Sequence, residues 1–468
     1  MIKKTHGDFQ TPVLLTNEIC QMAAEFGWKP KTIFEPTCGE GNFITSAVKY
    51  FGEVEKILGV DINLDYVNHC RERFARIEAV DARQGNFFGF KWDEIAAVAT
   101  QPILFLGNPP WVTNAFLMRE NSDNLPGKNN IDGLKGIDAI TGKSNFDISE
   151  WMIRRYCEIA KNKHFYLSVL CKTSVARKIL LWMYSGDWPV QNAKLYSIDA
   201  KKYFGVTVDA SILFLESRIE AEKYFFFYPS KEKPEKLFYR DGKFFREEST
   251  IRRISSNTEK RWRSGIKHDC ANVLVLKKLR NGYENQLNEN VQIEEELIYP
   301  FMKSSDVFNQ RSPSHWLILT QKAVGEETKS LETCFPKAWR YLLEHEIFFT
   351  KRKSRIYHNK PRFSIFGIGD YSLKPWKLAI SAMYKKLRFV KLGPIDGKPI
   401  LLDDTCYFIG FDSEHELDYS YQYFTSEEVT KIILSQVFWD EMRPITAKML
   451  NSIPFSNKNE TQLTIFTA

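Results

Sequence analysis

The sequence predicts an α/β fold with a parallel, doubly wound sheet for the first half of the chain, and a mixed α+β domain for the second half. Strand-like apolar runs alternate with helix-like segments up to about residue 215, and this alternation is typical of parallel sheets covered by helices. The alternation ends near residue 220, where an aromatic run at 224–228 is followed by a charged stretch at 230–236. We therefore expect two domains, residues 1–225 and 226–468.

Each element of the first domain is predicted from its apolar pattern and from the residues that start or stop it. Helices are expected over residues 11–26, 41–51, 64–75 and 146–161. Strands are expected over residues 32–35, 56–61, 102–107, 165–170 and 210–215. The first helix follows a Thr-Pro start, and the third strand must end at Pro109 and Pro110, because proline has no N–H to donate.

Composition limits the class of protein. Hydrophobic residues make up 43% of the chain and charged residues 26%, as in soluble globular proteins, and no apolar run is long enough to span a membrane. The eight cysteines lack Cys-x-x-Cys spacing, so we expect neither a metal site nor a disulfide framework. A reduced, cytoplasmic setting without membrane association fits this pattern. The net charge of +7 permits a nucleic-acid partner without requiring one.

The most informative motif is Asn108-Pro109-Pro110-Trp111, which directly follows the strand at 102–107. The prolines make the turn stiff, so that the Asn108 side chain, the Pro109 carbonyl and the Trp111 ring keep one arrangement. Two oxygens can accept the two N–H groups of an exocyclic amine, and the ring can stack on a planar base. The alternative is a rigid turn with a buried tryptophan.

A second motif, Glu35 to Phe43, follows the first strand and opens a helix. Gly39 and Gly41 let the backbone pass close to a ligand, and Asp61, 22 residues after Gly39, can accept ribose hydroxyls from the end of the next strand. The third glycine of a dinucleotide fingerprint is missing near Ile44. The loop therefore suits an uncharged nucleoside such as that of S-adenosylmethionine, although a plain strand-to-helix turn is the alternative.

In this order, the motifs resemble those of γ-group adenine-N6 DNA methyltransferases of type II restriction-modification systems, which carry a C-terminal target-recognition domain. The resemblance covers about the first 215 residues. Its motifs are Asp8 to Pro12, Glu35 to Phe43, Asp61, Asn108 to Trp111 and Tyr203 to Ala210. The chain departs from the family at Gly85-Asn86-Phe87-Phe88, where the family usually has an Asp-Phe pair.

The resemblance implies a class I S-adenosylmethionine-dependent methyltransferase sheet, S-adenosylmethionine as cofactor and no metal. The implied catalytic residues are Asn108, Pro109, Pro110 and Trp111. The implied cofactor site consists of Thr11, Pro12, Glu35, Thr37, Gly39, Gly41, Asp61, Ile62, Asn86, Phe87 and Asn108. Trp111 and Phe204 would hold an adenine that has left the duplex, with Phe204 against the face or edge of the base that Trp111 leaves open.

Basic clusters mark the second half of the chain as a candidate DNA-recognition domain. They lie at residues 252–268, 351–362 and 385–388. The candidate DNA contacts are Arg261, Arg263, Lys267, Arg352, Lys353 and Arg355. A solvated charged face is the alternative for each cluster. The resemblance implies double-stranded DNA as partner, action as a monomer on DNA, and protection of host DNA beside a separate restriction endonuclease. An orphan or phage-defence role is the alternative.

Two rival functions remain open at this point. RNA adenine methyltransferases and protein glutamine methyltransferases also carry Asn-Pro-Pro-aromatic, but they usually lack a C-terminal domain with basic clusters. A non-catalytic DNA-binding protein on the same fold is the second rival. The intact Gly39, Gly41, Asp61 and Asn108 argue against it.

Overall fold

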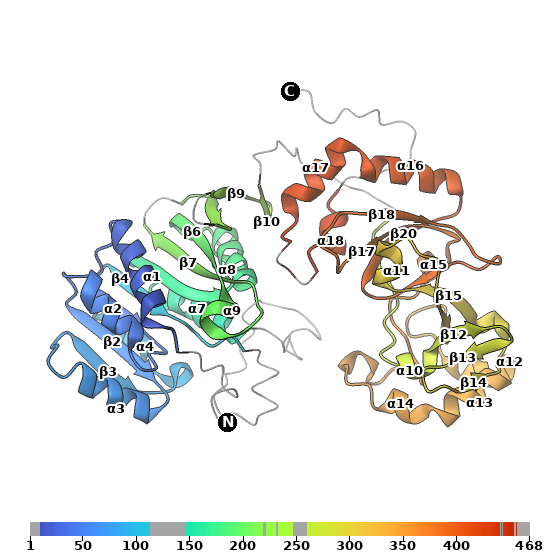
Figure 1. Ribbon diagram of the computed structural model, residues 1–468, viewed down its shortest axis with the longest axis horizontal. Helices are drawn as coiled ribbons and strands as arrows, with labels where there is room; N and C mark the ends of the chain where they lie inside the picture. The colour runs from blue at the N-terminus through green and yellow to red at the C-terminus, as the bar shows by residue number, and fades with distance from the viewer. Residues whose placement is uncertain are drawn as a thin grey trace. The chain divides into compact units, whose positions relative to one another are not determined.

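The structure is a computed structural model that describes residues 10–112, 147–218, 221–230, 233–246, 260–439, 441, 443–453 and 455. The chain forms two compact units, Met1–Ser249 and Thr250–Ala468, whose elements are labelled in Figure 1. Within the part of the chain that the structure describes, no helix is long and apolar enough to cross a membrane.

A single sheet forms the centre of the first unit, in the strand order β10-β9-β8-β6-β7-β5-β4-β1-β2-β3. Its strands are β1 (Thr32–Glu35), β2 (Lys56–Asp61), β3 (Val80–Gln84), β4 (Ile103–Gly107), β5 (Phe165–Lys172), β6 (Val190–Ile198), β7 (Ala210–Ser217), β8 (Tyr224–Tyr228), β9 (Glu235–Arg240) and β10 (Lys243–Phe245). Strands β1 to β5 are parallel, as predicted.

Strand β7 departs from the predicted parallel sheet, because it runs antiparallel to both β5 and β6. Only residues 199–209 separate β6 from β7, and they hold the short helix α9 (Ala200–Phe204). A parallel pair needs a crossover of a dozen or more residues, whereas an antiparallel pair can be joined by a shorter connection. The short connection therefore fits the reversal of β7.

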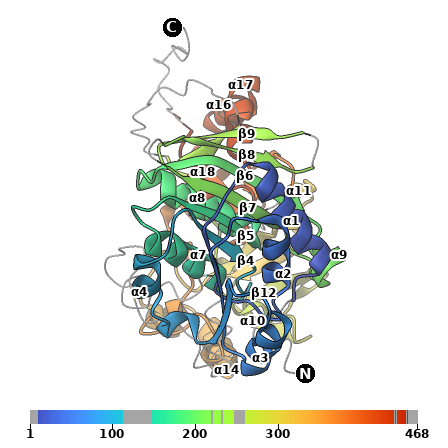
Figure 2. The same ribbon diagram turned by 90° about the vertical axis from the view of Figure 1, so that its left-hand side faces the viewer.

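Helices cover both faces of this sheet. They are α1 (Val13–Glu25), α2 (Asn42–Tyr50), α3 (Leu64–Arg73), α4 (Trp92–Ala97), α7 (Ile148–Ile159) and α8 (Thr173–Ser185). Figure 2 shows α1 and α2 on one side of the sheet and α7 and α8 on the other. Leu15 and Ile19 of α1 and Ile44 of α2 pack in one core cluster with Leu104 and Leu106 of β4. This packing fixes the helices at the strand ends that carry the motifs.

The boundary between the units differs from the prediction. Strand β8 pairs in parallel with β6, from Lys194↔Phe226 to Tyr196↔Tyr228, and β9 and β10 continue the same sheet. The first unit therefore extends to Ser249 instead of ending at residue 225. The aromatic run at 224–228 is a sheet strand, although its composition marked the end of the alternating pattern.

The second unit is mixed α+β, as predicted. One sheet has the order β14-β13-β12-β16-β15-β19 and the other β11-β20-β17-β18. The first comprises β12 (Val275–Leu279), β13 (Gly282–Glu284), β14 (Asn290–Val291), β15 (Ile298–Met302), β16 (His315–Ile318) and β19 (Leu401–Leu402). The second comprises β11 (Arg263–Ser264), β17 (Trp376–Ser381), β18 (Phe389–Leu392) and β20 (Cys406–Phe411).

Short helices complete the second unit. They are α10 (Ala271–Leu274), α11 (Ser304–Phe308), α12 (Leu331–Cys334), α13 (Pro336–Glu344), α14 (Glu346–Thr350), α15 (Asp370–Leu373), α16 (Glu414–Thr425), α17 (Glu427–Gln436) and α18 (Ala447–Leu450). Leu342 of α13 packs in a core cluster with the six-stranded sheet, and Leu417 of α16 packs with the four-stranded sheet.

Candidate active site

Three predicted motifs meet at one edge of the first sheet. Strand β1 lies between β2 and β4 and is parallel to both, so their carboxyl ends share an edge. Glu35 ends β1, Asp61 ends β2, and Asn108 directly follows β4. Ligands of open α/β sheets bind outside the carboxyl ends of the strands, so this edge is the candidate active site.

The glycine loop adopts a backbone that requires glycine at two positions. Gly39 has φ +49° and Gly41 has φ +77°, both in the left-handed region. A Cβ on Gly39 would lie 2.5 Å from Gln10 Oε1, and one on Gly41 would lie 2.8 Å from the Phe74 ring. Glycine is therefore needed at both positions, for the left-handed backbone and for the space that the Gln10 and Phe74 side chains occupy.

Asp61 is tied to this loop. Its Oδ2 accepts a hydrogen bond from the Gly39 N–H at 2.9 Å, and its Oδ1 accepts one from the Asn63 N–H at 2.9 Å. Each carboxylate oxygen has a second lone pair, so Asp61 can still accept hydroxyl donors. Ile62, the next residue, is 51% exposed. The acid and the exposed apolar side chain lie side by side, as a nucleoside site requires.

Glu35 is a buried carboxyl group, only 2% exposed. Its Oε2 has no hydrogen-bond partner among the described residues, and the same holds for the buried Thr37 Oγ1. Burial raises the pKa of Glu35 well above its ordinary value; the nearby Cys70 and Asp61 raise it further, and the Ile44 N–H lowers it. A buried carboxyl with one oxygen lacking a described partner suits a cationic ligand group, because an opposite charge would stabilise its ionised form.

Three side chains outside the predicted set hold the loop in place. Gln10 Oε1 accepts the Glu40 N–H at 3.1 Å, Asn42 Nδ2 donates to the Thr11 carbonyl at 3.0 Å, and the Cys70 thiol donates to the Gly39 carbonyl at 3.3 Å. Gln10 lies within the quoted N-terminal motif, so the sequence offered a signal for it. Cys70 carries no motif, and only the packing of α3 brings it to the loop.

Asn108 is half-buried, and its Nδ2 donates to Thr11 Oγ1 at 3.3 Å. Pro109 is buried and Pro110 half-buried, so the turn after β4 is packed as well as stiff. Gly107 has φ +146°, a backbone conformation that favours glycine, and it lies beside Glu35. The structure thus brings Thr11 and Asn108 together from distant parts of the sequence.

Trp111 and Phe204 are in contact with each other. Their ring centroids lie 5.2 Å apart at 73°, an edge-to-face pair. Trp111 is 8% exposed, and its indole N–H donates to the Leu170 carbonyl at 3.4 Å. The two ring planes are not parallel and leave no gap for a base between them. A base could stack between the rings only if they separated.

Asn86 and Phe87 both have partners within the protein. Asn86 Oδ1 accepts the Phe88 N–H at 3.0 Å and caps the 3₁₀ turn Phe87–Gly89. The Phe87 ring is 7% exposed and packs edge-to-face on Tyr156, while its carbonyl accepts the Trp92 indole N–H at 3.1 Å. Asn86 and Phe87 therefore help to fix the turn that follows β3.

One of the predicted DNA contacts in the second unit has an internal role. The Arg352 guanidinium lies 3.6 Å from the Tyr357 ring centroid and donates to the carbonyls of Phe349, Ser364 and His268 at 3.1, 2.6 and 3.3 Å. Burial lowers its pKa. The sequence could not distinguish this arginine from its neighbours, because the Ser364 and His268 carbonyls lie 12 and 84 residues away along the chain.

The other predicted DNA contacts differ in their surroundings. Arg261 and Lys353 are exposed. Arg263 is exposed but lies over the Tyr371 ring at 5.1 Å, and Lys267 pairs with Asp269 at 3.1 Å. The Arg355 side chain lies outside the described residues, as do Arg252 and Arg253. Arg261 and Lys353 are therefore the candidates best placed to meet a polyanion.

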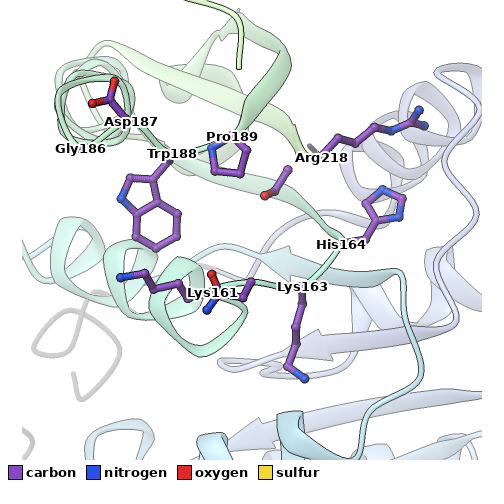
Figure 3. Close-up of a pocket in the computed structure, with 10 residues that line it drawn as sticks. Lys161, Lys163, His164, Gly186, Asp187, Trp188, Pro189 and Arg218 are labelled. Atoms are coloured by element: carbon purple, nitrogen blue, oxygen red, sulfur yellow. The ribbon is translucent and has the colours of Figure 1, made fainter. Parts of the chain in front are cut away.

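A pocket of about 400 Å³ lies at the opposite edge of the first sheet, where β5 begins (Figure 3). Trp188 and Pro189 line it, and Lys161 Nζ lies 5.7 Å from the Trp188 ring centroid. Helices α7 and α8 end beside it, and cations near helix C-termini are favourable in any protein. None of the predicted site residues lines this pocket.

Comparisons with known proteins agree with the predicted fold class. No family model matches the chain. The chain is 41% identical over 462 residues to the type II methyltransferase M.NspV of Nostoc sp. (strain ATCC 29411 / PCC 7524), covering 96% of each chain. It also superposes on the type IIL restriction-modification enzyme MmeI with a TM-score of 0.57 and 13% identity, over 98% of this chain and 67% of that one. The predicted class I methyltransferase sheet is confirmed.

Proposed function

Because the chain belongs to the type II methyltransferases, with S-adenosylmethionine as methyl donor, we propose that it methylates the N6 amine of an adenine in double-stranded DNA. The observation that carries this proposal is the position of Asn108. It follows β4 at the sheet edge where Glu35 and Asp61 end the two neighbouring strands. An amide acceptor thus lies beside the candidate cofactor site.

The residues present fit the cofactor. When bound, S-adenosylmethionine supplies an electrophilic methyl group on a sulfonium. Glu35 would hold its ammonium group, since the Glu35 Oε2 is buried without a described partner. Asp61 would accept the ribose hydroxyls, next to the glycine loop that it holds through the Gly39 N–H. Ile62 is exposed where an adenine ring would need an apolar surface.

Asn108 and Pro109 would prepare the target amine. Asn108 Oδ1 and the Pro109 carbonyl would accept its two hydrogens, which draws the nitrogen lone pair out of conjugation with the ring. Much of the rate would then come from holding the nitrogen in line with the methyl group. The proton leaves the nitrogen after the new N–C bond has formed, so no strong base is needed beforehand.

The target adenine must leave the duplex to reach Asn108. Trp111 and Phe204 are the rings on which it would stack, at ~1–3 kcal/mol per base. Since these rings touch each other at a centroid distance of 5.2 Å, base entry would part them. The contact between the rings would thus keep the site closed until a base arrives.

The second unit would select the DNA site. Two observations support this role. The unit follows the catalytic sheet along the chain, and its Arg261 and Lys353 are exposed. A separate restriction endonuclease would cut the same sequence when it is unmodified, and one protein chain would act as a monomer on DNA.

The decisive experiment offers the full chain three substrates: unmethylated plasmid DNA, RNA and protein, each with tritium-labelled S-adenosylmethionine. Labelled DNA is then digested to nucleosides and separated. Label in N6-methyladenosine of DNA is the expected result, and label in another base, in RNA or in protein glutamine overturns the proposal. Sequencing that detects modified bases, with and without the gene, then gives the recognition sequence.

A further inference from the structure

Thr11 contacts two motifs that lie far apart in the sequence. Its carbonyl accepts a hydrogen bond from Asn42 Nδ2 at 3.0 Å, at the start of α2 behind the glycine loop. Its hydroxyl accepts one from Asn108 Nδ2 at 3.3 Å, in the catalytic turn. Thr11 itself is 5% exposed. One buried residue therefore joins the cofactor loop to the asparagine that would receive the target amine.

Helix packing sets the position of Thr11. The carbonyl of the next residue, Pro12, accepts the N–H groups of Leu15 and Thr16 at 2.9 and 3.1 Å and begins α1. Leu15 and Ile19 of α1 then pack in the same core cluster as Ile44 of α2. The Thr11 hydroxyl is thus held by the scaffold and does not depend on a flexible side chain.

The chemical consequence concerns the orientation of a carboxamide. The two ends of the Asn108 amide differ, because Nδ2 can only donate and Oδ1 can only accept. In the structure the Thr11 hydroxyl accepts from Nδ2, which leaves Oδ1 to face the remaining side of the site. In the reverse orientation, an NH₂ group would face the N–H groups of the target amine, and methyl transfer would lose its acceptor.

We propose that Thr11 is a positioning residue that orients the Asn108 amide for methyl transfer, beyond any contact with the cofactor. This proposal rests on the proposed role of Asn108. It predicts that loss of the Thr11 hydroxyl slows the chemical step, while the affinity for S-adenosylmethionine stays unchanged.

The test compares three substitutions in the full chain. Thr11→Val keeps the shape of the side chain and removes the acceptor, whereas Thr11→Ser keeps the acceptor. Thr16→Val is the matched control, since it removes another buried hydroxyl next to the same segment without touching Asn108. Single-turnover methylation is measured with unmethylated plasmid DNA and saturating labelled S-adenosylmethionine, and cofactor affinity is measured by calorimetry.

Thr11→Val should lower the single-turnover rate about tenfold, the effect of one hydrogen bond, with cofactor affinity unchanged within about twofold. Thr11→Ser should restore most of the rate, and Thr16→Val should keep it even if its melting temperature falls. A normal rate for Thr11→Val overturns the proposal. So does an equal loss in Thr11→Ser or Thr16→Val, or a parallel loss of cofactor affinity.

The proposed function is tested separately in the same assay by Asn108→Ala. If that variant keeps its rate, the role of Asn108 fails, and with it the premise for Thr11. If Asn108→Ala is inactive and Thr11→Val is normal, only the positioning role fails. If the wild-type chain methylates RNA or protein instead of DNA, the same comparison is made on that substrate.

Discussion

Asp61 Oδ2 accepts a hydrogen bond from the main-chain N–H of Gly39 at 2.9 Å. The acid at the end of β2 therefore holds the glycine loop that follows β1. The Asp61 carboxylate has two roles. It holds the glycine loop, and it is the proposed acceptor for the ribose hydroxyls of the cofactor. Substitutions at this residue can separate the two.

Asp61→Ala should weaken S-adenosylmethionine binding by ~1.5–3 kcal/mol, the scale of hydrogen bonds to a charged group. Titration calorimetry measures the dissociation constant directly. Asp61→Asn should bind better than Asp61→Ala, because one side-chain oxygen remains to accept the Gly39 N–H. An unchanged constant in Asp61→Ala would contradict the assignment of this residue to the cofactor site.

Cofactor binding should depend on pH through Glu35. Burial raises the pKa of this carboxyl in the free protein, and a cationic ligand group would favour its ionised form. Binding should then release a proton, and affinity should rise with pH until the pH exceeds the raised pKa. By the same linkage, the stability of the free protein should fall as pH rises from about 4.5 through that pKa, since the folded state holds the extra proton.

Calorimetry in buffers of different ionisation enthalpy, repeated at several pH values above 4.5, counts the protons released. Glu35→Gln should bind more weakly and lose the pH dependence. Glu40→Gln, on the same loop, is the control and should keep both. Equal pH profiles for the wild type and Glu35→Gln would show that Glu35 does not meet the cationic end of the cofactor.

Asn108→Ala should abolish methylation and leave cofactor affinity nearly intact, because the side chain is proposed to act on the transition state. Single-turnover rates should fall by about two or three orders of magnitude, as when an oxyanion-type donor is lost. Retention of more than about a tenth of the rate would contradict this role.

The catalytic edge could be predicted because its residues belong to local patterns. Strands β1 and β2 have the predicted bounds, Thr32–Glu35 and Lys56–Asp61, since short apolar runs with clear ends leave little freedom. Strands β8 to β10 could not be assigned to the sheet, because β8 pairs with a strand earlier in the chain and its pattern does not show which one. The contact between Thr11 and Asn108, like that between Arg352 and the His268 carbonyl, depends on tertiary packing alone.

Lys377 should make the stability of the second unit depend on pH. This lysine of β17 is 1% exposed; its ammonium donates to the Lys374 carbonyl at 2.6 Å, and burial lowers its pKa to about 7. The unfolded chain keeps an ordinary lysine pKa, so between about pH 7 and pH 10.4 unfolding takes up a proton, and stability should rise with pH.

Lys377→Met should therefore stabilise the protein most at or below about pH 7, by a few kcal/mol on the order of its pKa shift, and little near pH 10. Calorimetric unfolding of the full chain at both pH values measures this difference. Lys374→Met is the control, because that lysine is partly exposed and paired with Asp412 at 2.5 Å. An equal gain at both pH values would mean that Lys377 is not a buried cation.

Substitution of Lys353 should change DNA binding, whereas substitution of Arg352 should change stability, although the two residues are neighbours in the same basic cluster. Lys353 is exposed. If it contacts a phosphate, Lys353→Ala should weaken binding to all DNA and reduce the salt slope, the slope of log affinity against log salt concentration, by about one. If it reads a base, specificity should relax at one position, with a loss of ~1–3 kcal/mol. Arg352→Ala should instead lower stability by ~2–3 kcal/mol, because it leaves buried carbonyls without their donor.

Binding of both variants to cognate and scrambled duplexes at several salt concentrations separates these outcomes, and thermal unfolding reports stability. Lys351→Ala, an exposed lysine of the same cluster that is not among the predicted contacts, is the control for a general loss of charge. If Lys353→Ala changes neither affinity nor salt slope, this part of the cluster is a solvated face. If Arg352→Ala keeps full stability and loses DNA binding, the arginine reads DNA despite its internal hydrogen bonds. The pair thus tests whether burial, which the sequence pattern does not reveal, decides which charges of a basic cluster reach the nucleic acid.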